Sequence, residues 1–180
     1  QGKIPTIRSF PALDALEEAI GLCAEKGTMA WFPMGGGPID DPQGTPGQIL
    51  SMSVLGYTTK FAAKMGVKLV TGTCRPNMVP MLDDVLYEGF KGYGAPELYS
   101  LENIRFYPSQ MAYIAGNSTI MTYEKPACQI MIGNWWAETP AFCEIAKRAG
   151  AFIVGGTDYM ENVAYLVAFS DYSLVFEEIY

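Results

Sequence analysis

The feature that most constrains the fold is the alternation of short, continuously apolar runs with longer amphipathic segments. The runs predict strands at 29–33, 67–71, 104–107, 127–132, 151–154 and 172–176. Helical spacing of apolar residues predicts helices at 11–26, 48–65, 77–91, 139–149 and 158–166, and Ser109 is suited to cap a further helix. Strands without polar alternation are covered on both faces, which indicates a parallel sheet. The sequence therefore predicts one three-layer, Rossmann-like α/β domain over residues 1–180, with a mostly parallel sheet of about six strands and helices on both faces.

The chain has no histidine, and this absence removes several classes of site at once. Ser-His-Asp and Cys-His nucleophiles, histidine-based zinc sites and histidine pH switches all need the imidazole ring. The four cysteines form no C-x-x-C pair and lie among apolar neighbours, which is typical of buried free thiols. No acidic spacing of the D-x-D-x-D-G type is present, so the sequence predicts no metal site.

Charge is sparse and negative, with a net charge of −7 and only 17% of residues charged. The 12 Lys and Arg residues are scattered along the chain without a basic stripe. Binding to a nucleic-acid backbone and attraction to anionic lipid both depend on clustered cations. The sequence therefore predicts no nucleic-acid partner and no electrostatic attraction to lipid. A chain poor in charge and rich in Met, Trp and Tyr favours a homo-oligomer, because these residues are enriched at the centres of interfaces.

A Gly- and Pro-rich segment, 35–47, follows the first predicted strand. Its glycines match neither G-x-G-x-x-G nor the phosphate-binding loop that ends in Gly-Lys-Ser or Gly-Lys-Thr. The sequence therefore predicts no cofactor. Loops of this length in compact domains are usually functional or disordered. The pattern is compatible with a lid, with a subunit contact and with a loop that binds a ligand.

Polar residues follow several of the predicted strands, and ligands of open parallel sheets bind outside these carboxyl ends. Asn134 and Glu138 follow the fourth strand, Thr157 and Asp158 follow the fifth, and Asn77 follows the second. These are the candidate ligand-binding residues, whereas the sequence assigns no catalytic residue. Other polar residues on the same predicted rim are Arg75 and Gln110. The same residue types also serve in turns and helix caps, so a purely structural role is the alternative.

Short stretches spread over nearly the whole chain carry a family resemblance. They are 15–21, 55–56, 111–116, 124–127, 132–133, 137–138, 156–157, 170–174 and 177–180. Together they resemble an uncharacterised prokaryotic family that carries only the label of a domain of unknown function. The resemblance implies one N-terminal membrane helix upstream of Gln1, followed by a soluble domain on the cytoplasmic side, and it implies no catalytic residue. Segment 35–47 is longer than the family pattern, so a family-wide role for it does not follow.

Two functional hypotheses follow from these observations. The first is a membrane-associated, non-enzymatic assembly or scaffold domain that self-associates through apolar and aromatic surface. The alternative is a Rossmann-like domain that binds a small molecule or nucleotide at the carboxyl ends of the strands, with or without enzymatic activity. We also expect a segment of a longer chain, because Gln1 is not an initiator methionine and residues 176–180 resemble the start of a helix.

Overall fold

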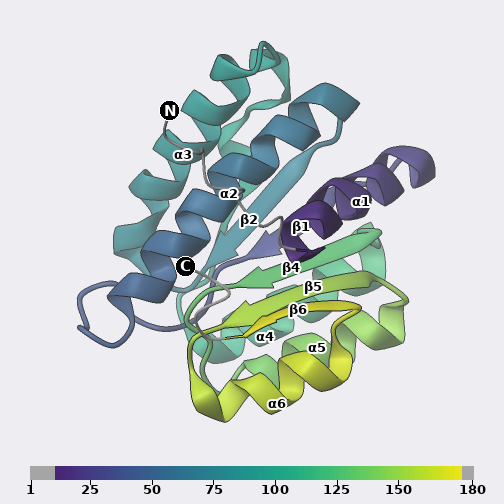
Figure 1. Ribbon diagram of the computed structural model, residues 1–180. Helices are drawn as coiled ribbons and strands as arrows, with labels where there is room; N and C mark the ends of the chain where they lie inside the picture. Colours follow the sequence, from purple (N-terminus) through teal and green to yellow (C-terminus); the bar gives the residue numbers. More distant parts are fainter. Residues whose placement is uncertain (1–10, 176–180) are drawn as a thin grey trace, which may run out of the picture.

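Six strands form one sheet in which every neighbouring pair is parallel (Figure 1). The computed structural model describes residues 11–175. The strands are β1 (Ala30–Pro33), β2 (Leu69–Thr73), β3 (Ile104–Phe106), β4 (Cys128–Ile132), β5 (Phe152–Thr157) and β6 (Tyr172–Val175). Their order across the sheet is β3-β2-β1-β4-β5-β6. The order reverses between β1 and β4, which is the topological switch point of a doubly wound fold.

Helices cover both faces of this sheet (Figure 1). One face carries α1 (Pro11–Lys26), α2 (Thr45–Met65) and α3 (Val79–Gly92), and the other carries α4 (Gln110–Thr119), α5 (Thr139–Ala149) and α6 (Met160–Phe169). Short 3-10 helices are η1 (Pro76–Met78), η2 (Pro96–Leu98) and η3 (Leu101–Asn103), and a π-helix, η4 (Ile120–Glu124), follows α4. The predicted three-layer α/β class is confirmed.

Alternating residues of the central strands separate two hydrophobic cores. Phe32 and Leu69 belong to the core under α1, α2 and α3, whereas Trp31 and Val70 belong to the core under α4, α5 and α6. All four side chains are fully buried, which explains why the strands read as continuous apolar runs. The Trp31 ring lies so close to Gly72 that a Cβ at this glycine would come within 2.4 Å of it.

Helix ends mostly follow the chemistry that the sequence predicts. The Ser109 hydroxyl accepts a hydrogen bond from the Ala112 N–H at 3.2 Å and caps α4. Gly150 ends α5 with a φ of 72°, a left-handed conformation that glycine adopts at little cost. Helix α2 begins at Thr45, before its predicted start at residue 48, because Pro46 fits the first helical turn.

Two local features differ from the prediction. β5 extends beyond its predicted end at residue 154, because Gly156 pairs with both Ile132 and Leu174 of the neighbouring strands. The apolar spacing also does not predict the π-helix η4. This helix ends at Glu124 and is followed by Lys125, whose φ of 47° is the only positive value among the non-glycine residues between positions 11 and 175. Such a conformation is strained for a residue with a Cβ.

The four cysteines are free thiols, as predicted. Cys23, Cys128 and Cys143 are buried, and Cys74 is half-buried. The predicted helix start at 176–180 lies outside the described residues. Between residues 11 and 175, no helix is both long enough and apolar enough to cross a membrane.

Candidate functional site

The carboxyl ends of β1 and β4 meet at the switch point, where open α/β sheets usually leave a ligand crevice. In this structure the chain itself fills that place. Residues 35–37 follow β1, and the Gly37 N–H donates a hydrogen bond to the Asn134 carbonyl at 3.2 Å. Residues 35–37 are buried, and Asn134 keeps only 1% of its surface exposed. We call residues 35–37, together with Asn134 and Glu138, the switch-point plug.

The Glu138 carboxylate is fully buried within the plug and faces donors of its own chain. Its Oε1 accepts the N–H of Gly36 at 2.6 Å and the N–H of Trp136 at 3.2 Å. Its Oε2 accepts a hydrogen bond from the side-chain amide of Gln110. Glu138 also lies directly before α5, where the partial positive charge of the helix end favours a carboxylate. These contacts hold the carboxylate in the interior and do not offer it to solvent as a base.

Three consecutive glycines make the close packing of the plug possible. A Cβ at Gly35 would lie 2.0 Å from the Asn134 carbonyl oxygen, and one at Gly37 would lie 2.0 Å from Asn134 Oδ1. A Cβ at Gly36 would lie 2.5 Å from Glu138 Oε1. The neighbour of Gly35 is backbone, so the close approach requires glycine at this position, whereas a larger residue at Gly36 or Gly37 would displace the Glu138 or Asn134 side chain. The first part of segment 35–47 therefore packs on the chain's own β4–α5 connection.

The carbonyl groups of the plug are bound as well. Gln48 Nε2 donates hydrogen bonds to the carbonyls of Gly35 and Gly37, at 2.7 and 2.8 Å. Arg75 Nε donates to the Gly36 carbonyl at 2.8 Å. The Gly36 peptide groups thus connect a buried carboxylate on one side with a guanidinium on the other. Both charged groups are used to fix the backbone of residues 35–37.

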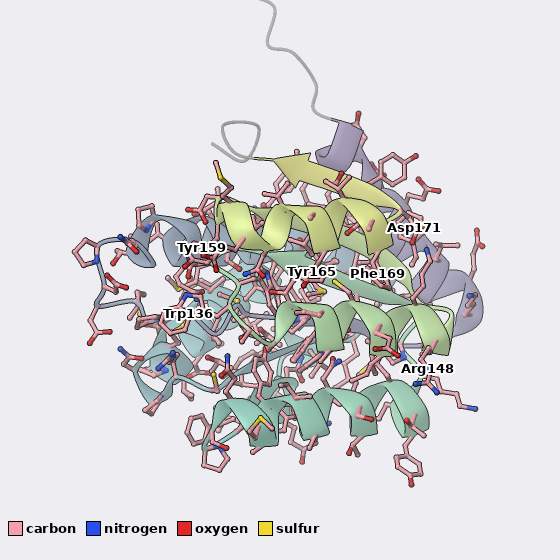
Figure 2. The ribbon with its side chains drawn as sticks, turned by 90° about the horizontal axis from the view of Figure 1, so that it is seen from below. Trp136, Arg148, Tyr159, Tyr165, Phe169 and Asp171 are labelled. Atoms are coloured by element: carbon pink, nitrogen blue, oxygen red, sulfur yellow. The ribbon has the colours of Figure 1, made fainter. Side chains whose placement is uncertain are left out.

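Trp136 covers the outer side of the plug and is 36% exposed. Its Nε1 donates a hydrogen bond to Asn134 Oδ1 at 2.8 Å, and the Arg75 guanidinium lies 5.6 Å from the centre of its ring. Figure 2 shows Trp136 beside the start of α5. This cation–π contact and the hydrogen bond orient the indole over the closed crevice.

Tyr113 of α4 lies in the interior next to the plug. Its hydroxyl is 2.9 Å from the Met34 carbonyl and 2.7 Å from the Gly72 carbonyl, and it therefore contacts the backbone at the ends of both β1 and β2. Burial raises the pKa of Tyr113 well above its usual value. Burial also raises the pKa of the nearby Cys74 thiol. Both groups therefore keep their protons near neutral pH, and neither supplies a base or a nucleophile there.

Comparison with known families adds to this geometry. The family described as "Domain of unknown function (DUF6754)" matches residues 1–180. The chain belongs to this family. The match confirms the resemblance to a family of unknown function. Among curated proteins, the comparison found no match.

The structure of this DUF6754 domain brings together Asn134 and Glu138, which the sequence predicts as neighbours in a site. Asp158 lies near Asn134, since a Cβ placed on Gly47 at the start of α2 would be 3.1 Å from both Asp158 Oδ1 and Asn134 Cβ. Thr157 is the last residue of β5 and is almost fully buried.

The remaining candidates have local positions in the DUF6754 fold. The Thr157 hydroxyl accepts the Tyr159 N–H at 3.1 Å, which is ordinary turn chemistry. Asn77 is exposed in η1 and takes no part in the plug. The sequence analysis missed Gln48 and Tyr113. Their signal is a polar group on the buried side of a helix, where only a partner in the interior satisfies it.

The chemistry available to the DUF6754 domain at the switch point is limited by these contacts. In the part of the chain from residue 11 to 175, no group of three or more Cys, Asp or Glu side chains could hold a metal ion. Hollows of about 610, 300 and 400 Å³ open instead near the amino ends of the strands. A further hollow of about 420 Å³ lies between α2 and α3. The arrangement at the switch point closes the sheet end.

Proposed function

We propose that this DUF6754 domain is a non-enzymatic assembly or scaffold domain, tethered to a membrane, that self-associates through the outer face of α6. The exposed apolar surface of α6 is the observation that carries the proposal. The closed switch point supports its non-enzymatic part. The membrane tether, an N-terminal helix outside this chain, is proposed from the family resemblance.

The outer face of α6 is almost without charge. Its exposed residues are Met160, Glu161, Ala164, Tyr165, Val167 and Ala168, and Glu161 is the only charged residue of the helix. Val167 exposes 52% of its surface and Tyr165 exposes 43%. Figure 2 shows α6, α5 and α4 in this order on one face of the sheet. Apolar surface of this kind is favourably removed from water by contact with a partner.

A second copy of the chain suits this surface. Ala164 and Ala168 lie one helical turn apart, and their short side chains allow two α6 helices to approach closely. Tyr165 and Val167 then pack beside the crossing point. A two-fold arrangement buries the same patch on both copies. Glu161, in the first turn, is the only charged residue that this helix brings near the contact.

The alternative function, a small-molecule site at the switch point, would require the plug to open. A ligand there would have to displace residues 35–37 and break the bonds from Gly36 and Trp136 to Glu138. The buried carboxylate would then need new donors, because a buried charge without partners is costly. Self-association through α6 requires no such rearrangement.

Light scattering over a range of protein concentrations tests the self-association. We expect a dimer or larger species for the wild type and a monomer for Val167→Glu, because a carboxylate is costly to bury in an apolar contact. Ile49→Glu is the matched control, since Ile49 exposes 51% of its surface on α2. We expect its mass to equal that of the wild type. A wild-type monomer at high concentration would overturn the proposal, and so would equal dissociation of both variants.

A further inference from the structure

Two of the four cysteine thiols lie in direct contact in the interior. The Sγ atoms of Cys23 in α1 and Cys128 in β4 are 3.4 Å apart, and both residues are fully buried. The two residues are 105 positions apart in the sequence, so only the fold brings their thiols together. A disulfide bond joins two sulfur atoms at about 2.0 Å, so the atoms would have to approach each other by about 1.4 Å to form one.

The backbone around the two thiols holds them opposite each other. Cys23 lies in the last turn of α1, and the N–H of Thr28, just after this helix, bonds to the Cys23 carbonyl at 2.9 Å. The Thr28 hydroxyl in turn accepts the N–H of Ala127 at 3.1 Å. Ala127 directly precedes Cys128, the first residue of β4, whose side chain belongs to the same core as Cys23. The end of α1 and the start of β4 are therefore joined at the point where the two sulfur atoms meet.

The other two cysteines lie far from this pair. Cys143 is also fully buried, but it belongs to the core on the opposite face of the sheet, where its sulfur lies 4.0 Å from the thioether of Met131. Cys74 is half-buried and follows β2 at the carboxyl end of the sheet, whereas Cys128 begins β4 at the amino end. Of the four thiols, only those of Cys23 and Cys128 are thus placed to react with each other.

The hydrogen bond between the two thiols makes them chemically unequal. This bond lowers the pKa of Cys23, although burial opposes the shift. The same bond, together with burial, raises the pKa of Cys128 well above its usual value. Since the thiolate is the nucleophile in thiol oxidation, Cys23 is the sulfur that reacts first, and Cys128 keeps its proton beside it.

A hollow of about 400 Å³ opens beside Cys23 at the amino end of the sheet. Cys23, Gly27 and Thr28 contribute to its wall. A Cβ at Gly27 would meet nothing within 4 Å, so open space begins directly after α1. A small oxidant such as hydrogen peroxide fits into this hollow. Because Cys23 is fully buried, its reaction requires a brief local opening of the last turn of α1.

We propose that Cys23 and Cys128 form a site of reversible oxidation, at which a small hydroperoxide converts the two thiols into a disulfide bond between α1 and β4. The bond would attach α1 covalently to a central strand of the sheet. The inference goes beyond self-association through α6 and does not depend on it, because α6 lies on the opposite face of the sheet from α1.

The oxidation proceeds in two steps. The Cys23 thiolate attacks one oxygen of the peroxide and the O–O bond breaks, so that Cys23 becomes a sulfenic acid. The other oxygen takes up the proton that Cys23 lost and leaves as water or an alcohol. The Cys128 thiol then attacks the Cys23 sulfur, the S–O bond breaks, and water leaves. Two thiols are thus oxidised and one peroxide is reduced, and an external thiol reverses the change by thiol–disulfide exchange.

Counting of free thiols by mass spectrometry tests this proposal. The protein is treated with an equimolar amount of hydrogen peroxide, unfolded in denaturant and labelled with iodoacetamide. The reduced wild type should take up four labels, one for each cysteine. The oxidised protein should take up two, and fragmentation of its peptides should locate one bond, between Cys23 and Cys128. Dithiothreitol should restore all four labels.

Alanine variants provide the matched control. Cys128→Ala should form no disulfide, whereas Cys143→Ala removes a thiol that is equally buried and should still lose two labels. Four labels on the oxidised wild type, a bond between any other two cysteines, or the same loss of labels in both variants would overturn the proposal. The peptide fragments come from the wild type, so this result stands even where a variant fails to fold. Self-association is measured on the reduced protein, so the two proposals can fail separately.

Discussion

The two ends of the sheet differ in whether the space beyond the strands is filled. At the carboxyl end, residues 35–37 pack on Asn134 and Glu138 and close the crevice. At the amino end, hollows remain and exposed cations line them. Figure 2 shows both ends, with Trp136 and Tyr159 at the closed end and Arg148 and Asp171 at the open end. A doubly wound topology thus provides a crevice at the switch point, and the residues of the loops that follow the strands determine whether this crevice is open to a ligand.

Glycine serves opposite purposes at the two ends. At the closed end it provides space, because a Cβ on Gly35 would lie 2.0 Å from a backbone oxygen. At the open end it provides conformation: Gly66 and Gly150 have positive φ, and a Cβ there would meet nothing within 4 Å. Glycine-to-alanine substitutions at the two ends should therefore lower the free energy of unfolding by different amounts.

The largest expected effect is at Gly35. Gly35→Ala should lower the free energy of unfolding by about 3 kcal/mol, because the new methyl group meets backbone that has no room to move. Gly150→Ala is the matched control and should cost about 1 kcal/mol, the price of a left-handed conformation for alanine. Urea unfolding of both variants measures the difference. Equal losses would mean that the plug is looser than the structure indicates.

Glu138 provides the next largest effect. Glu138→Gln should lower the free energy of unfolding by about 2 kcal/mol. The new NH₂ group replaces one acceptor oxygen, so a buried donor that now bonds to Glu138 would face another donor. Glu144→Gln, on the exposed side of the same helix, should change it by less than about 0.5 kcal/mol. Unfolding in urea again provides the measurement. An unchanged stability for Glu138→Gln would contradict the structural role and favour a site for a ligand.

The smallest effect has the opposite sign and belongs to the open end. Lys125→Gly should raise the free energy of unfolding by about 0.5 kcal/mol, because glycine adopts the φ of 47° without strain. Lys147→Gly, in the last turn of α5, should lower it by about 1 kcal/mol through lost helix propensity. Thermal melts of the pair reveal the difference in sign. Destabilisation by Lys125→Gly would show that the lysine side chain contributes packing that outweighs its strain.

Much of the fold follows from local patterns in the sequence. The continuous apolar runs predict the strands because those residues are buried on both faces, and Ser109 and Gly150 mark helix ends through cap chemistry. The π-helix η4 does not follow, because its spacing departs from the helical period only within one turn. The start of α2 is also earlier than predicted. Proline is common both in loops and in the first turn of a helix, so Pro46 does not by itself indicate where the helix begins.

The candidate site could be predicted only in part. Asn134 and Glu138 follow one strand, so their proximity to each other is expected, but their partners in residues 35–37 are not. Spacing along the chain does not tell whether a glycine-rich loop turns inward or extends outward. Asn77 illustrates the converse, because it also follows a strand and is exposed. The position of the helix C-termini at the amino end of the sheet does follow from topology, once the sheet is known to be parallel.

The pairing of β1 with β4 has a consequence for the order of folding. Among the described strands, every other pair joins strands that are consecutive in the sequence, whereas Ala30 lies opposite Cys128. Each half of the sheet can therefore assemble from local units, and joining the halves closes the longest loop. The hydrogen bond between Gly36 and Glu138 joins the two halves, so we expect it to form only after this step. We therefore expect substitutions in the plug to act mainly by speeding unfolding and to leave the folding rate nearly unchanged.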